Sequence, residues 1–198
     1  MRAELAAAGI EGAEISGFRV LTAYASLDMI ATLQISLMLA IALSVVLIGI
    51  AFRSWKLALV SIIPNSLPIL LTELFLYSSG IQLQLTTVIS LTIAFGIAVD
   101  DTIHFLAHYA RARERGESIS HAVDTTLDRV GPALIATTLI LIAGCAVVTV
   151  SVLPQVALFG FLTVITLLSA LIGDLIVLPA LLIGGGMMFA RWSERKNE

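Results

Sequence analysis

Five long apolar runs, separated by short polar links, set the pattern of this chain. Each run holds about 20 residues or more, and a helix of that length, rising about 1.5 Å per residue, crosses the hydrocarbon core of a bilayer. Inside lipid the backbone must satisfy its own hydrogen bonds, so the runs are expected to be helices. The expected spans are residues 29–52, 57–77, 85–107, 132–153 and 156–183. The pattern predicts an all-α integral membrane protein with five transmembrane helices.

The segments outside this bundle, which covers residues 29–183, are short. Residues 1–28 are interpreted as the remnant of an extracytoplasmic domain. Within them the stretch Gly17–Ala25 mixes β-branched and aromatic residues, which is compatible with one β-strand. Residues 184–198 are expected to form a cytoplasmic tail.

The link between the third and fourth spans is expected to contain a short helix of its own. Gly116 should end the helix that extends from the third span, and Ser118 can cap the next one. Apolar residues then recur at helical spacing over residues 119–130. This pattern fits an amphipathic helix along the cytoplasmic membrane interface, and it fits a solvated connector helix equally well.

Composition and charge agree with a membrane protein and predict its orientation. Hydrophobic residues make up 59% of the 198 residues and charged residues 13%, whereas soluble domains carry roughly 25% charged residues. Basic residues gather on one side, and that side is expected to be cytoplasmic. The nine on that side are Arg53, Lys56, Arg111, Arg113, Arg115, Arg129, Arg191, Arg195 and Lys196, against Arg2 and Arg19 on the other. The N-terminus is therefore expected outside and the C-terminus in the cytoplasm, with membrane lipid and not nucleic acid as the surroundings.

Two adjacent acids, Asp100 and Asp101, interrupt the third span near the middle of the membrane. A carboxylate at the centre of a membrane helix costs roughly 2.5–3.5 kcal/mol on insertion scales, so intramembrane acids usually serve a function. Asp174 in the fifth span and Thr138 in the fourth are expected at a similar depth. Desolvation and mutual repulsion disfavour two ionised carboxylates side by side, so such a pair can take up and release a proton.

A small and polar stripe runs along the third span and is expected to face the bundle, where a glycine lets a neighbouring helix approach. Its members, spaced by four residues, are Thr92, Gly96, Asp100, His104 and His108. Asp101 lies on the flank of this stripe. The arrangement indicates a proton relay; acids that only join helices by hydrogen bonds, and a metal site at Asp100, His104 and His108, are the less favoured interpretations.

Two other spans carry features that suit packed and bent helices. Pro64 and Pro68 in the second span free backbone carbonyl groups and should bend that helix. The fifth span presents a second small and polar packing face. Its members are Thr163, Thr166, Ala170, Gly173 and Asp174.

Three segments carry a resemblance to a known family. They are FRSWKLALVSIIPNSLPILLT, LTIAFGIAVDDTIHFLAHY and LFGFLTVITLLSALIGDLIVLPALL. In this order they resemble the RND superfamily of transporters, and within it the MMPL-like and sterol-sensing-domain branch of predicted RND exporters. The G-x-x-x-D pattern from Gly96 to Asp100, followed by Asp101, is similar to the proton-relay helix of that family.

The resemblance implies a function and a partner. Family members usually have twelve spans in two repeats, and this chain resembles the C-terminal five-helix part of one repeat. The missing half or another copy of the chain would complete the transporter in a bacterial-type inner membrane. The cargo would be a lipid or another hydrophobic molecule, and the proton would be the coupling ion, with no other cofactor and no metal. Asp100 and Asp101 would form the relay, supported by His104, Gly96, Thr138 and Asp174.

Two other functions compete with export. A lipid-sensing, sterol-sensing or scaffolding membrane module would use the same bundle without transport. An intramembrane aspartyl protease would also use two membrane acids, but such enzymes resemble Gly-x-Gly-Asp on one helix and Tyr-Asp on another. Here LIGD leads to Asp174 and no Tyr-Asp occurs, so an enzyme is not expected.

Overall fold

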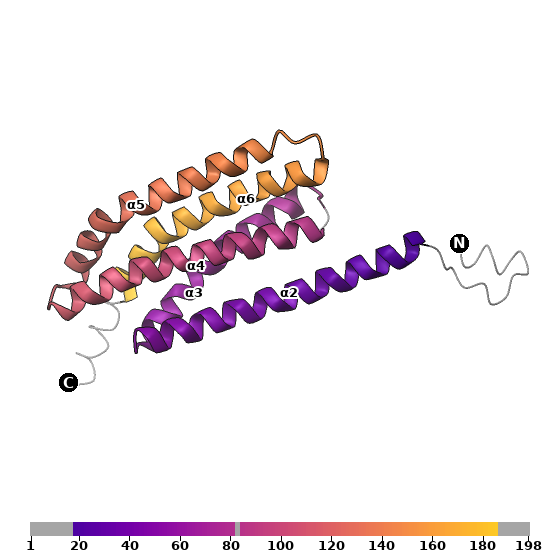
Figure 1. Ribbon diagram of the computed structural model, residues 1–198. Helices are drawn as coiled ribbons and strands as arrows, with labels where there is room; N and C mark the ends of the chain where they lie inside the picture. Colours follow the sequence, from indigo (N-terminus) through magenta and orange to yellow (C-terminus); the bar gives the residue numbers. More distant parts are fainter. Residues whose placement is uncertain (1–17, 82–83, 186–198) are drawn as a thin grey trace, which may run out of the picture.

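The computed structural model describes residues 18–81 and 84–185, and the side chains within them from residue 29 onward. These residues are helical apart from short links (Figure 1). The helices are α2 (Phe18–Ala51), α3 (Trp55–Ser78), α4 (Leu85–Glu114), α5 (Ile119–Val148) and α6 (Pro154–Ile172), followed by a π-helix, η1 (Gly173–Val177). The chain continues as an α-helix from η1 to residue 185. Within the described part, five helices are long and apolar enough to cross a membrane, which confirms the predicted fold class.

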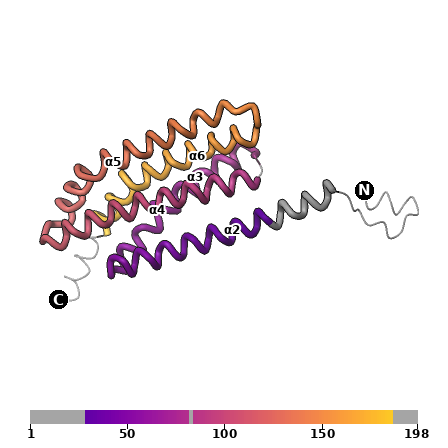
Figure 2. Tube along the Cα trace, in the orientation of Figure 1, coloured from indigo at the N-terminus to yellow at the C-terminus, as the bar shows by residue number. Residues whose placement is uncertain are grey.

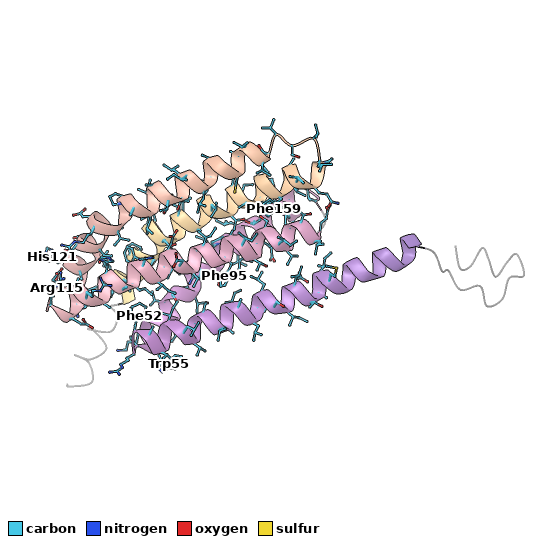
Figure 3. All side chains as sticks on the ribbon, in the orientation of Figure 1. Phe52, Trp55, Phe95, Arg115, His121 and Phe159 are labelled. Carbon is cyan, nitrogen blue, oxygen red and sulfur yellow. The ribbon has the colours of Figure 1, made fainter. Side chains whose placement is uncertain are left out.

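Successive helices run in opposite directions, and α6 lies in the middle of the bundle (Figures 1 and 2). It packs against α3, α4 and α5, whereas α2 packs mainly against α3 and α4. Phe52 and Trp55, at the link from α2 to α3, lie at the same end as Arg115 and His121, at the link from α4 to α5 (Figure 3). The two links, which carry Arg53 and Arg115, are therefore at one end of the bundle.

Small residues let the helices of this bundle approach closely, which matters because lipid supplies little hydrophobic driving force between them. A Cβ atom added to Gly160 on α6 would lie 2.8 Å from the carbonyl oxygen of Cys145 on α5. Two apolar clusters fill the interior. The first includes Phe105, Leu106, Val123 and Leu178, and the second consists of Leu37, Ile69, Leu91 and Phe95. Large apolar side chains such as Leu39 and Ile140 cover the outside, where lipid would surround them.

The structure corrects the predicted N-terminal strand. α2 begins at Phe18, so the part of Gly17–Ala25 that the structure describes is helical, and the strand prediction is wrong. Gly17 itself lies outside the described residues. No proline or glycine follows until Gly49, so the chain can continue the first membrane helix through its mixed stretch.

The structure also corrects the separate interfacial helix. α4 does end before Gly116, which has a φ of 86°, and the Ser118 hydroxyl caps the next helix by accepting from the backbone N–H of His121 at 3.3 Å. Both of these predictions are confirmed. However, α5 runs from Ile119 through Pro132 without a break, and it changes direction in its first half (Figure 1). A proline removes one backbone donor and bends a helix that flanking turns can still hold together, so the two predicted elements are one helix.

Candidate functional site

α4 has two small and polar faces, and the bundle covers the one that was not predicted. Gly96, Asp100 and His104 are exposed, and a Cβ atom added to Gly96 would find nothing within 4 Å. The opposite face, which includes Ala98 and Thr102, is fully buried. The prediction that the Gly96–Asp100–His104 stripe faces the bundle is therefore wrong for this chain. Alanine and threonine are small enough for close helix packing, and they carry no full charge into the interior.

The acidic pair lies along an open groove between α4 and α5, which has a volume of about 390 Å³. Asp100, Asp101 and His104 line its α4 side, and Ala133 and Thr137 are among the residues of its α5 side. Asp101 is partly covered, whereas Asp100 is exposed. The pair stands halfway along the 30-residue helix α4, which is long and apolar enough to cross a membrane.

A buried polar network joins three helices behind this groove. The hydroxyl oxygen of Thr102 on α4 lies 2.8 Å from Asn65 Oδ1 on α3 and 2.6 Å from Asp174 Oδ1 in η1. Each of the three side chains is at most 2% exposed. Asn65 Nδ2 and Asp174 Oδ2 are also buried, and neither has a hydrogen-bond partner in the described part of the chain. Such groups are costly inside a bundle, which makes the network a second candidate site.

The hydroxyl of Thr102 carries one proton and therefore cannot donate to both neighbouring oxygens. Two arrangements satisfy the count. In the first, a protonated Asp174 donates to Thr102, which donates to Asn65 Oδ1. In the second, the Asn65 amide is turned by 180°, its Nδ2 donates to Thr102, and Thr102 donates to an ionised Asp174. The direction of the chain of hydrogen bonds is thus linked to the protonation of Asp174, because only a protonated carboxyl can donate to Thr102.

Backbone geometry explains how Asp174 reaches this position. The N–H of Leu178 donates to the carbonyl of Gly173, five residues back, and Pro179, the next residue, has no N–H to donate to the helical ladder. On the facing helix Pro68 likewise leaves the Pro64 carbonyl without its helical donor. A Cβ atom added to Gly173 would lie 3.0 Å from that Pro64 oxygen, so the glycine lets η1 pack directly on α3.

The small and polar face predicted for α6 is confirmed by its contacts. Its Thr166 hydroxyl lies 2.9 Å from that of Thr72 on α3, and its Thr163 hydroxyl lies 2.8 Å from that of Ser90 on α4. These bonds attach the central helix to two neighbours. Thr138 on α5 is also buried, but its hydroxyl has no partner within the described residues and does not line the groove.

The structure thus brings together Asp100, Asp101 and His104, and it separately brings together Asp174, Thr102 and Asn65. Sequence reasoning missed Thr102 and Asn65. The signals were available in principle: Asn65 stands between two prolines, and Thr102 lies on an alanine-lined face. In the described part of the chain, no three His, Cys, Asp or Glu side chains are grouped so that they could hold a metal ion.

Comparison with known proteins places this bundle in a family. Residues 14–182 match the AcrB/AcrD/AcrF family. The chain belongs to this family. Its members are transporters of the RND superfamily, so the match confirms the resemblance to that superfamily that the sequence predicted.

Two relatives are membrane proteins according to their names. The chain is 25% identical over 138 residues to the predicted membrane protein MJ1562 of Methanocaldococcus jannaschii, covering 70% of this chain and 36% of that protein. It is 25% identical over 153 residues to the predicted membrane protein ActII-3 of Streptomyces coelicolor, covering 75% of this chain and 21% of that protein. The chain therefore spans about a third or less of the length of these relatives.

Proposed function

We propose that this AcrB/AcrD/AcrF-family chain supplies transmembrane helices to a proton-driven exporter of lipid or other hydrophobic cargo, of the MMPL-like and sterol-sensing-domain branch. The observation that carries the proposal is the pair Asp100 and Asp101, with His104, on an open groove halfway along a helix of membrane-spanning length. Acids there are costly unless they exchange protons or meet a partner. One proton crossing the membrane supplies roughly 2.3 kcal/mol per 100 mV, enough to shift a two-state bundle.

The exposed acidic face supports an incomplete assembly. Asp100 would face hydrocarbon if the chain stood alone in lipid, because no described helix covers it. A second polypeptide, either the other transporter half or another copy of this chain, would cover the groove and complete the relay. The basic links at one end of the bundle support an inner-membrane orientation with that end in the cytoplasm.

The buried network offers a route from the relay to the rest of the bundle. Thr102 follows Asp101 directly on α4 and bonds both Asn65 on α3 and Asp174 in η1. If Asp101 became neutral, α4 could move relative to α5. The hydrogen bonds of Thr102 would then transmit that movement to α3 and η1. In this scheme Gly96 leaves space beside α4. The buried hydroxyl of Thr138, which has no hydrogen-bond partner among the described residues, can form a hydrogen bond when the helices move.

Transport by the complete assembly, reconstituted in vesicles with an imposed proton gradient, tests the relay. Asp100→Asn and Asp101→Asn should each abolish gradient-driven export of a fluorescent lipid while leaving membrane insertion intact. Glu73→Gln is the matched control, since Glu73 is an exposed membrane acid on α3 that does not line the groove. Export retained by both aspartate variants would refute the relay. Lipid binding that ignores pH and Asp100→Asn, without export, would instead favour the lipid-sensing module.

A further inference from the structure

Asp174 is an acid enclosed by the bundle, in contrast to the pair on the groove. It is 2% exposed, and it is the only charged residue of α6 and its helical continuation to residue 185. Its Oδ1 lies 2.6 Å from the Thr102 hydroxyl oxygen, and its Oδ2 has no hydrogen-bond partner among the described residues. A buried carboxylate that lacks both a cation and a full set of donors is costly.

The ionisable groups around Asp174 do not compensate a negative charge there. The η1 segment packs against α3, α4 and α6. On α4, Asp101 is near enough to act electrostatically on Asp174, and it is a second acid, whereas Asp100 and His104 are exposed. The ionisable residues of α3 are all exposed and lie toward the ends of that helix; they are Lys56, Glu73 and Tyr77. An ionised Asp174 would therefore place a second negative charge near Asp101.

The count of donors and acceptors separates the two arrangements of the buried network. With an ionised Asp174 and a turned Asn65 amide, the charged Asp174 Oδ2 and the Asn65 Oδ1 both lack a donor. With a protonated Asp174, Oδ1 donates its proton to Thr102 and Oδ2 is a neutral carbonyl oxygen. Only two neutral groups, this oxygen and Asn65 Nδ2, then lack a partner within the described part of the chain. A neutral unpaired group costs less than a charged one, so the structure favours the protonated arrangement.

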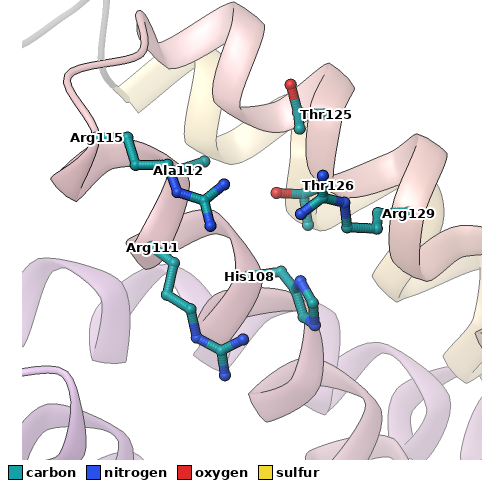
Figure 4. A pocket seen from close by; sticks show the side chains of 7 residues that line it. All are labelled: His108, Arg111, Ala112, Arg115, Thr125, Thr126 and Arg129. Atoms are coloured by element: carbon teal, nitrogen blue, oxygen red, sulfur yellow. The ribbon is translucent and has the colours of Figure 1, made fainter.

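The space around the network suits a proton and not a larger ligand. The groove and a smaller basic pocket at the α4–α5 link, whose lining includes Arg115 and Arg129 (Figure 4), do not have Asp174 or Thr102 among their lining residues. The oxygen atoms of the network are in direct hydrogen-bond contact, at 2.6 and 2.8 Å, which leaves no place for a metal cation between them. A proton adds almost no volume.

We propose that Asp174 is a proton-binding residue of the bundle, which holds its proton against Thr102 in this conformation and releases it when the Asn65 amide turns. Release reverses both hydrogen bonds of Thr102, so the charge of Asp174 is connected to α3 and α4. Its role in transport rests on the proposed function, to which it adds a second and enclosed proton site. The proton itself can be detected in the isolated chain, without export.

Infrared spectroscopy of the purified full chain, recorded as the pH is raised, tests the proton. A protonated carboxyl whose carbonyl oxygen accepts no hydrogen bond absorbs at a higher frequency than a fully hydrogen-bonded one. The wild type should show this band and lose it on titration. Asp174→Asn should fold, because its amide can donate to Thr102 as the protonated acid does, and should lack the band. Glu73→Gln, which removes an exposed acid of α3, should keep it.

Three results of this titration would overturn the proposal. They are a wild type without the band, an Asp174→Asn protein that keeps it, and a band that persists until the protein unfolds, which would make Asp174 a structural group only.

A matched pair of valine variants tests the position of the proton. Thr102→Val removes the acceptor of the Asp174 hydroxyl and should shift the band. Thr92→Val removes a hydroxyl that bonds only the carbonyl of Val88 on α4, so it should leave the band unchanged. An unshifted band in Thr102→Val would refute the bond from Asp174 to Thr102.

Export by the complete assembly separates this site from the relay. Asp174→Asn should abolish gradient-driven export, because an amide cannot release the proton, and export by that variant would refute its role in transport. The double variant Asp100→Asn with Asp101→Asn should lose export but keep the infrared band. If that double variant exports and keeps the band, the relay fails and the Asp174 site stands. If it loses export while the wild type lacks the band, the Asp174 site fails and the relay stands.

Discussion

Replacing Thr102 by valine removes one hydroxyl from the centre of the bundle and keeps the shape of the side chain. That hydroxyl makes two interhelical hydrogen bonds, at 2.6 and 2.8 Å. Interhelical hydrogen bonds in membrane proteins average about 0.6 kcal/mol and reach about 1.7 kcal/mol. Thr102→Val should therefore lower the free energy of unfolding by about 1–3 kcal/mol. The carboxyl of Asp174 and the amide of Asn65 would then both be buried without this partner.

Matched variants give the prediction a scale. Thr92 bonds only the carbonyl of Val88 on its own helix, so Thr92→Val removes no interhelical bond. Thr72 makes one such bond, to Thr166. Equilibrium unfolding in bicelles should rank the losses as Thr92→Val smallest, Thr72→Val intermediate and Thr102→Val largest. A Thr102→Val protein that unfolds with the same free energy as Thr92→Val would refute the reasoning that the network holds three helices together.

Two glycine substitutions probe the close helix contacts in the same assay. Gly173→Ala should cost about 1–3 kcal/mol because its Cβ would lie 3.0 Å from the Pro64 carbonyl oxygen, which is backbone and cannot swing away. Gly160→Ala should cost at least as much, since its Cβ would lie 2.8 Å from the Cys145 carbonyl oxygen. Gly144→Ala is the control, with nothing within 4 Å, and should be neutral or stabilising; equal losses at all three positions would contradict the contacts.

Length and hydropathy were sufficient to predict the five spans, because a bilayer imposes a minimum on every crossing segment. They were less informative at the ends. The stretch from Phe18 to Ala25 has no strong helix signal, and helix continuity from Met29 decided its structure. Pro132 looked like a boundary between two helices, but α5 absorbs it with a bend.

The orientation of α4 could not be predicted because both of its faces carry small residues. Gly96 and Asp100 suggest one inner face, while Ala98 and Thr102 suggest another, and spacing alone cannot choose between them. Which face of α4 is buried depends on the helices that pack against it. The partners of Thr102 are 37 and 72 residues away, so no local pattern could have joined them.

The wide turn at Gly173–Val177 has a consequence for comparing relatives. A π turn holds one residue more than an α turn, and each residue turns a helix by about 100°. Everything from Leu178 to residue 185 is therefore out of step with the helix that starts at Pro154. A four-residue spacing counted from Thr166 therefore assigns positions beyond this turn to the wrong face of the helix. An alignment gap of one residue at the turn would mark a change in the hydrogen-bonding pattern and not the loss of a helix.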